Sequence, residues 1–183
     1  SKIDYLNEGD PEGNQWIVGQ CDVSIRPGWF YHSDQDSLVK SPQQLADIYY
    51  KSVGRNALLL LNLPPDKRGL IYENDVKVLT DFKSIIDESL AIDLAKEQKI
   101  TSNNFRSKHS KFSPSNTLDG DSTTYWATDD NIFPASLEIE LNKKRTFDRI
   151  LIQEPIRFGQ RISEFEIDVM GDTGWKSVFK GTT

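Results

Sequence analysis

The sequence predicts a chain of two parts, an α/β segment followed by an all-β segment. In residues 1–92, two amphipathic helical patterns flank a continuous apolar run, which is typical of a strand covered by helices. After that point apolar and polar residues alternate with a period of two, as in antiparallel strands with one solvated face. No convincing helical pattern occurs after residue 100. The predicted domains are therefore residues 1–92 and residues 93–183.

The first part contains one long loop, two helices and a strand. Residues 1–33 are rich in Gly, Pro, Asn and Asp and predict a long loop. The run from Ser41 to Gln44 predicts a helix start with a capping box, and Gly54 is the predicted stop of that helix. Residues 57–63 predict a strand that is buried on both faces. A second amphipathic helix is expected over residues 74–90.

The second part is predicted from shorter patterns. Residues 137–141 and 165–169 alternate strictly and predict strands, and residues 150–152 do so more loosely. Residues 172–174 read Asp-Thr-Gly and predict a hairpin turn that leads into a strand at 175–179.

Composition excludes several classes of function. The chain has 22 Lys and Arg against 28 Asp and Glu, a net charge of −6, so we expect no nucleic-acid partner. The longest apolar run, residues 57–61, is far shorter than the ~20 residues that a membrane helix needs, so we expect no membrane span. Cys21 is the single cysteine and lacks a partner for a disulfide or a zinc site, so we expect a small packed side chain there.

Three runs in the first part resemble a known family. Residues 16–32 read WIVGQCDVSIRPGWFYH, residues 47–56 read DIYYKSVGRN, and residues 58–69 read LLLLNLPPDKRG. In this order they resemble the late part of the catalytic domain of α-L-fucosidases of glycoside hydrolase family 29. The resemblance covers about residues 3–90.

This resemblance implies a fold and a reaction. The family folds as a (β/α)8 barrel, which needs about 250 residues, so residues 1–92 would be its C-terminal portion. We therefore expect missing upstream barrel residues, or self-association, to complete the fold. The implied enzyme is a retaining glycoside hydrolase that releases terminal α-L-fucose from fucosylated glycans, with no cofactor for catalysis. Retaining enzymes use two carboxyl groups ~5–5.5 Å apart.

We expect no catalytic residue in this chain. In the family the nucleophile is an aspartate in a Trp-Phe-Asp-Gly-like segment, and no such segment occurs here. Glu8 and Asp22 are weak substitutes, because acidic residues are common in this half of the chain. The chain alone is expected to be inactive and to contribute a wall of the sugar pocket.

An aromatic cluster at residues 29–32 supplies the expected substrate-binding residues. Fucose has a methyl group and a face of C–H bonds, both of which suit an aromatic ring, and Trp29 is the best candidate. Arg26 and His32 are the expected hydrogen-bonding partners of the sugar hydroxyls. The alternative is that Trp29 packs beneath the loop and that Arg26 and His32 form structural ion pairs or caps.

The second part also resembles a known family. Residues 116–126 read NTLDGDSTTYW and residues 153–162 read QEPIRFGQRI. With the 137–141 strand they resemble the discoidin-like, coagulation-factor C-type sandwich, also seen as carbohydrate-binding modules of family 32. The implied fold is a galactose-binding-domain-like jelly roll, here an antiparallel β-sandwich that is incomplete at its C-terminal end.

This second resemblance implies a possible structural Ca²⁺ site. Asp119 would offer a carboxylate, Asp121 a carbonyl oxygen, and Thr124 a hydroxyl and a carbonyl oxygen. The alternative is a calcium-free turn capped by Asp119.

Sugar binding by the second part is the alternative function for the chain, as a non-catalytic carbohydrate-binding or structural module. His109, Phe112 and Phe133 are the candidate residues for it, because they lie in segments of loop character. The two resemblances together imply a periplasmic or secreted protein.

Overall fold

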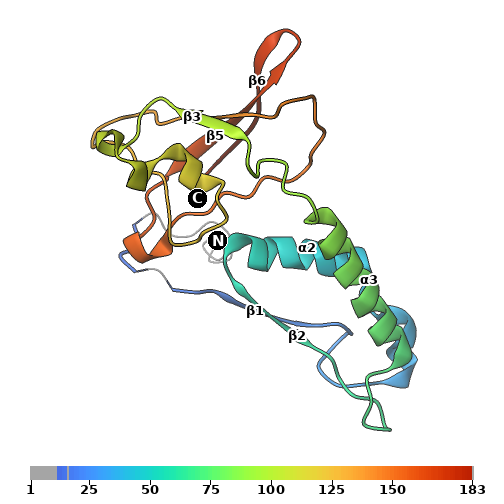
Figure 1. The fold of residues 1–183 in the computed structure, drawn as a ribbon. Coiled ribbons are helices and arrows are strands. Elements are labelled where there is room, and N and C mark those ends of the chain that lie inside the picture. The colour runs from blue at the N-terminus through green and yellow to red at the C-terminus, as the bar shows by residue number, and fades with distance from the viewer. Residues whose placement is uncertain (1–11, 16, 183) are drawn as a thin grey trace. The chain divides into compact units, whose positions relative to one another are not determined.

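The structure is a computed structural model that describes residues 12–15 and 17–182 (Figure 1). Part of the predicted first loop, together with Glu8 and Trp16, lies outside the described residues. The chain divides into two compact units, Ser1–Ala91 with Thr182–Thr183, and Ile92–Gly181. None of the described helices is long and apolar enough to cross a membrane.

A strand, a helix and a parallel strand form the frame of the first unit (Figure 1). Strand β1 (Gln20–Ser24) pairs in parallel with β2 (Leu58–Asn62), and helix α2 (Pro42–Ser52) lies between them in the chain. Helix α3 (Glu73–Ser89) follows and packs against α2. The predictions of both helices and of β2 are confirmed. The prediction of one long loop is wrong for β1. Turn-forming residues lie on both sides of this short strand, so the sequence pattern indicated a loop throughout.

Helix α2 begins as its sequence predicts but ends differently. The Ser41 hydroxyl accepts from the Gln44 amide at 3.2 Å, and the Gln44 side-chain oxygen accepts from the Ser41 amide at 2.8 Å. This reciprocal pair is a capping box. At the other end the helix passes into a 3-10 turn, Val53–Arg55, and Asn56 takes the left-handed conformation with φ 64°. The α-helix thus ends at Ser52, and Gly54 directly follows the C-cap residue Val53, but the left-handed residue is Asn56 and not Gly54.

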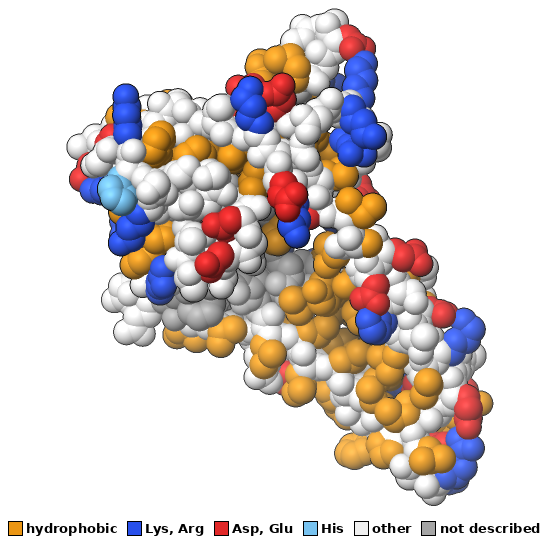
Figure 2. Space-filling model, in the orientation of Figure 1, with side chains coloured by type: hydrophobic (Ala, Val, Ile, Leu, Met, Phe, Trp, Pro, Cys, Tyr) orange, Lys and Arg blue, Asp and Glu red, His pale blue; other side chains and the backbone are white. Residues whose placement is uncertain are grey.

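Strand β2 is covered on one face only. Leu58 is 55% exposed and Leu60 is 54% exposed. On the other face, Leu59 and Leu61 line an apolar groove together with Tyr49 of α2 and Phe82 of α3. The prediction of burial on both faces is wrong, because no described segment packs over Leu58 and Leu60. Figure 2 shows apolar side chains gathered on the surface of this region.

The fully buried side chains of the first unit lie just beyond β1 and on the helices. Ile25 and Leu45 are the largest buried apolar residues, with 0% and 2% exposed. Beside them the unit buries two charged groups, Arg26 with 1% exposed and Asp75 with 0%. Such burial requires that the charges be paired, because an unpaired ion loses its hydration without compensation.

The second unit contains two pairs of strands. Strand β3 (Lys99–Ser102) pairs antiparallel with β4 (Leu137–Glu140), and β5 (Glu164–Gly171) pairs with β6 (Gly174–Thr182). The predictions of β4, β5, β6 and the intervening turn are confirmed. The looser prediction at residues 150–152 is wrong, because these residues form no strand. The described residues after 100 form 3-10 turns but no α-helix.

Candidate functional site

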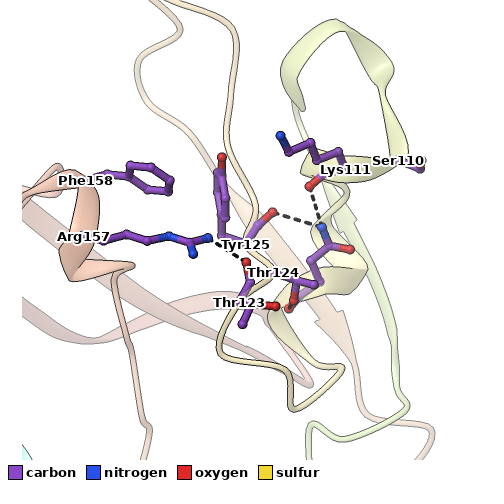
Figure 3. A pocket seen from close by; sticks show the side chains of 8 residues that line it. Ser110, Lys111, Thr123, Thr124, Tyr125, Arg157 and Phe158 are labelled. Carbon is purple, nitrogen blue, oxygen red and sulfur yellow. Dashed lines mark hydrogen bonds between the residues drawn. The ribbon is translucent and has the colours of Figure 1, made fainter.

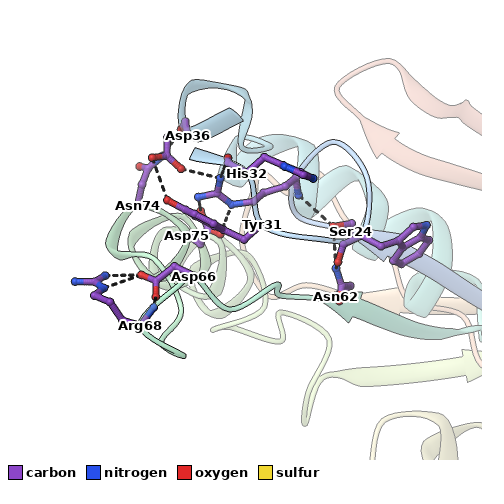
Figure 4. Close-up of polar contacts among 11 residues, drawn as sticks. Ser24, Tyr31, His32, Asp36, Asn62, Asp66, Arg68, Asn74 and Asp75 are labelled. Atoms are coloured by element: carbon purple, nitrogen blue, oxygen red, sulfur yellow. Dashed lines mark hydrogen bonds and ion pairs between the residues drawn. The ribbon is translucent and has the colours of Figure 1, made fainter. Parts of the chain in front are cut away.

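The carboxyl ends of β1 and β2 lie on the same edge of the parallel pair, which is where α/β folds place ligand sites. Asn62 ends β2, and its side-chain amide donates to the Ser24 hydroxyl at 3.0 Å and to the Trp29 carbonyl oxygen at 3.1 Å. Figure 4 shows Asn62 beside Ser24 at this edge. The end of one strand thus fixes the loop that follows the other.

A buried arginine fixes the same loop from inside. The Arg26 Nε and Nη2 atoms donate to the two carboxylate oxygens of Asp75 at 2.7 and 2.9 Å, and Nη1 donates to Asp36 Oδ1 at 2.8 Å. The pairing with Asp75 is bidentate, the geometry in which a guanidinium and a carboxylate interact most strongly. The pair connects Arg26, two positions after the end of β1, with Asp75 in the first turn of α3.

Two tyrosine rings enclose the guanidinium. The Arg26 Cζ atom lies 4.7 Å from the centre of the Tyr31 ring and 5.4 Å from that of Tyr72. The Tyr31 hydroxyl also contacts an Asp36 carboxylate oxygen at 3.4 Å (Figure 4). The hydrogen bond with Asp75 raises the pKa of Arg26, burial opposes that shift, and Asp36 adds to it. The guanidinium is therefore charged, paired and fixed in orientation.

The three residues that the sequence predicts to bind substrate differ from one another in their environments. Trp29 is 53% exposed on the loop that Asn62 holds. His32 is exposed, and its backbone carbonyl oxygen lies 3.4 Å from the Arg26 Nη1 atom. Arg26 is buried and directs its guanidinium at Asp75, Asp36 and that carbonyl oxygen. The sugar contacts of all three stay predictions, and Arg26 also performs the structural role named as its alternative.

Sequence reasoning missed the residues that hold this loop. Asp75 lies in the first turn of α3, where an acidic residue is expected from the helix dipole alone. Asn62 follows an apolar run, as a residue at the end of a strand often does. No residue near it in the sequence predicts its hydrogen bond to the Trp29 carbonyl oxygen. Asp22 is exposed and accepts from the Gln20 side-chain amide at 2.7 Å. The weak catalytic assignment of Asp22 stays a prediction.

The predicted calcium ligands of the second unit lie together in one turn. The Thr124 hydroxyl contacts the Asp119 Oδ2 atom at 2.7 Å and the Asp121 carbonyl oxygen at 2.9 Å. The other Asp119 oxygen accepts from the Asp121 amide at 2.8 Å. The Thr123 hydroxyl and amide both donate to the Asp121 carboxylate and lower its pKa. Among the described residues no group of three His, Cys, Asp or Glu side chains could hold a metal.

A pocket of about 470 Å³ opens beside this turn (Figure 3). Its lining residues are Ser110, Lys111, Asn116, Thr123, Thr124, Tyr125, Arg157 and Phe158.

Four rings follow one another along this part of the second unit. The ring centres are 6.4 Å apart for His109 and Phe112, 5.7 Å for Phe112 and Tyr125, and 5.2 Å for Tyr125 and Phe158. We call these four residues the aromatic run. Two of the three residues that the sequence suggests for sugar binding, His109 and Phe112, belong to it. The third, Phe133, lies outside the aromatic run, and its side chain is 87% exposed. Sequence reasoning missed Tyr125 and Phe158, whose proximity depends on the packing of distant segments.

Two family models match the chain, one in each part. Residues 2–87 match the model described as alpha-L-fucosidase. Residues 100–183 match the model described as F5/8 type C domain. The two matches occur in the order in which the sequence resemblances occur.

Among curated proteins, the chain is 41% identical to alpha-L-fucosidase 1 of Arabidopsis thaliana over 182 residues, which is 98% of this chain and 36% of that protein. A relative from Oryza sativa subsp. japonica, also named as an alpha-L-fucosidase, is 38% identical over 98% of this chain and 35% of its own length. The chain thus spans about a third of the length of these curated relatives.

Solved structures agree with these matches. The crystal structure of SpGH29 has a TM-score of 0.85 and 38% identity, over 99% of this chain and 39% of that one. The Ruminococcus gnavus GH29 fucosidase in complex with fucose has a TM-score of 0.86 and 33% identity, over 96% of this chain and 35% of that one. Residues 2–87 are therefore similar to the alpha-L-fucosidase family, and residues 100–183 are similar to the F5/8 type C domain.

Proposed function

We propose that this chain is part of an α-L-fucosidase, a glycoside hydrolase that releases terminal α-L-fucose from fucosylated glycans with retention. The observation that carries the proposal is the loop after β1. It lies in the family-matched segment, and it presents an exposed Trp29 while its backbone is fixed by Asn62 and Arg26. The relative from Ruminococcus gnavus, whose solved complex contains fucose, supports the choice of sugar.

The role of this chain in the reaction is to form one wall of the sugar pocket. The exposed Trp29 ring offers an apolar surface for the methyl group and the C–H face of fucose, which lose contact with water when they bind. The two carboxyl groups that a retaining mechanism requires are supplied by residues other than these 183. Arg26 keeps the loop in place through Asp75, so that the ring does not have to be ordered when sugar binds.

Two measurements on the 183-residue chain test this proposal. We expect no turnover of p-nitrophenyl α-L-fucoside, because the catalytic pair is absent, and turnover would contradict the assignment of a pocket wall. We expect L-fucose to perturb the fluorescence of the chain more than L-galactose, which differs by a hydroxyl at the position of the methyl group. The response should disappear in Trp29→Ala and persist in Trp175→Ala. An equal response to both sugars would reject the role of Trp29.

The finer fold follows from the same proposal. Residues 1–92 form the C-terminal portion of a (β/α)8 barrel, which the parallel β1–α2–β2 unit supports. Residues 93–183 form an antiparallel β-sandwich of the jelly-roll type, which the F5/8 type C match and the β3–β4 and β5–β6 pairs support. A fucosidase acting on glycans meets its substrate outside the cytoplasm, so we place the protein in the periplasm or among secreted proteins.

The Asp119 turn is the proposed site of a structural Ca²⁺. The Asp119 carboxylate, the Asp121 carbonyl oxygen and the Thr124 hydroxyl already converge, and oxygen donors of these three kinds suit calcium. A bound ion would cross-link the turn and stabilise the folded unit. The melting temperature should rise when calcium replaces a chelator, because a ligand bound only by the folded state stabilises it. Asp119→Asn should abolish that rise, and an unchanged melting temperature in the parent chain would reject the site.

A second candidate function is sugar binding by the F5/8 type C domain. The aromatic run and the adjoining pocket favour it, because partly exposed rings suit the C–H face of a sugar and the neighbouring polar groups suit its hydroxyls. Calorimetry with fucose and with galactose tests this function independently of catalysis. No heat with either sugar at millimolar concentration would reject it.

A further inference from the structure

The pocket of the second unit has two cations and no carboxylate in its lining. Lys111 and Arg157 supply the positive charge, and neither forms a salt bridge with the described residues. Some cations of the same unit are paired: Lys99 contacts Glu140 at 2.8 Å, and Lys144 contacts Asp172 at 2.7 Å. The lining thus carries positive charge and no carboxylate of its own, while the Asp121 and Asp119 carboxylates lie behind it, bonded to the Thr123 and Thr124 hydroxyls. The chain as a whole has a net charge of −6.

Arg157 is held in place by contacts that leave its charge available. Its Nη2 atom donates to the Thr123 carbonyl oxygen at 2.8 Å, and its Cζ atom lies 4.8 Å from the centre of the Phe158 ring (Figure 3). A guanidinium has five N–H donors, and this bond uses one of them. Contact with an aromatic face orients the group without neutralising it. Lys111 is similar, with its Nζ atom 5.6 Å from the centre of the Phe112 ring.

The rest of the lining suits a sugar ring. Tyr125 and Phe158 offer aromatic surface, with ring centres 5.2 Å apart, and Phe158 is 44% exposed. The Asn116 side-chain amide donates to the carbonyl oxygens of Lys111 and Tyr125 at 2.8 and 3.1 Å, which fixes the direction of its own carbonyl oxygen. The volume of about 470 Å³ is within the range of small-ligand pockets.

We propose that this pocket binds an acidic saccharide, a sugar that carries a carboxylate or a sulfate group. The ring lies against Tyr125 and Phe158, and the anionic group pairs with Lys111 and Arg157. This inference rests on the second candidate function, sugar binding by the F5/8 type C domain, and specifies that the bound sugar is negatively charged. The selectivity is local, because a chain with an overall negative charge does not attract anions in general.

Paired titrations of the full chain with galactose and galacturonic acid test the inference, since these sugars differ only at C6. Galactose 6-sulfate is a third ligand that distinguishes sulfate from carboxylate as the preferred anion. All titrations contain a chelator, so that no anion reaches the protein through a metal ion. We expect about fivefold tighter binding of the acidic sugars, as for a partly exposed ion pair. This advantage should fall between about 0.05 and about 0.5 M NaCl, while galactose binding stays constant.

Two variants locate the effect. Lys111→Gln and Arg157→Gln should each reduce the ratio of the affinities for galacturonic acid and galactose to about twofold or less. Lys144→Gln is the matched control, because it removes an exposed cation of the same unit that is paired with Asp172. It should leave the preference intact. Lys111 is exposed and serves as the decisive variant should Arg157→Gln fail to fold.

The outcomes separate this inference from the function on which it rests. Equal affinity of the parent chain for galactose and for both acidic sugars would overturn the inference while sugar binding stands. An equal loss of preference in Lys144→Gln would overturn it as well, since the charge of the whole unit would then be responsible. No binding of any of the three sugars would reject the second candidate function, and this inference with it.

Discussion

Arg26 shows how one residue decides the geometry of the loop after β1. Its side chain is fully buried, and so is that of Asp75, with which it forms a bidentate pair. A buried pair gains little over an apolar pair of the same size, but it costs much to break, because the remaining charge is left without a partner. The loop that carries Trp29 is therefore held in one arrangement.

Asp75→Asn should destabilise the chain by about 3 kcal/mol, because Arg26 would remain buried with Asp36 as its single acidic partner. The measurement is the free energy of unfolding from denaturant titration. Asp87→Asn, on the exposed surface of the same helix, is the control and should change that free energy by less than about 0.5 kcal/mol. Equal effects of the two variants would contradict the role assigned to the buried pair.

A second residue-scale prediction concerns Asp129. The Ser107 amide and the Asn104 side-chain amide donate to its carboxylate and lower its pKa from the usual 3.8. Because its pKa is lower in the folded state, the ionised carboxylate stabilises the fold at pH values above the unfolded-state pKa. This stabilisation is lost as the pH falls through the folded-state pKa. The melting temperature should therefore decrease below about pH 4, and less steeply in Asp129→Asn. Parallel pH profiles for the two proteins would rule out this contribution.

At the scale of elements, α2 has its own start signal, and its end depends on the neighbouring chain. The capping box at Ser41 satisfies two N–H groups that no turn of helix can satisfy. At the far end, the Ala57 amide donates to the Ser52 carbonyl oxygen at 2.9 Å, and Asn56 in the left-handed region turns the chain toward β2. The helix is thereby connected directly to the strand.

Ser41→Ala should lower the free energy of unfolding by about 1 kcal/mol, because one helix N–H group loses its acceptor. Ser41→Asp keeps an acceptor at that position and should restore most of the stability. Denaturant titrations of the three proteins, with equal m-values, provide the measurement. A stability of Ser41→Ala equal to that of the parent chain would show that the cap is dispensable.

At the scale of the whole molecule, much apolar surface is exposed. Leu58 and Leu60 form one face of β2, and they are neighbours on that face because side chains two positions apart in a strand point the same way. Contiguous exposed apolar patches mark surfaces that associate. This arrangement gives a physical basis for the expected association of the chain, with itself or with further barrel residues.

The apparent mass of the 183-residue chain in sedimentation should increase with protein concentration. The double variant Leu58→Lys with Leu60→Lys should reduce that increase, because it places two charges on the exposed face of β2. Phe133→Lys changes a single exposed ring of the second unit and should have little effect. A monomeric parent chain at all concentrations would contradict the expected self-association.

Local signals were predictable from the sequence, and long-range pairings were not. The capping box, the period of α3, the alternation in β4 and β5 and the turn before β6 each depend on residues within a few positions of one another. Of the candidate site, the sequence identified Trp29 and its loop. It did not identify Asn62, which holds that loop from a position 33 residues later.

What the sequence by itself determined is the order of both α-helices and four of the strands, the two family resemblances and part of each candidate site, such as Trp29 and His109. The tertiary structure alone decided which of those residues meet. Arg26 and Asp75 are 49 residues apart, and the Arg157 bond to Thr123 spans 34 residues. The physical reason is that caps and periodicities arise from local sterics and hydrogen bonding, whereas a buried ion pair or a pocket exists only after distant segments have packed.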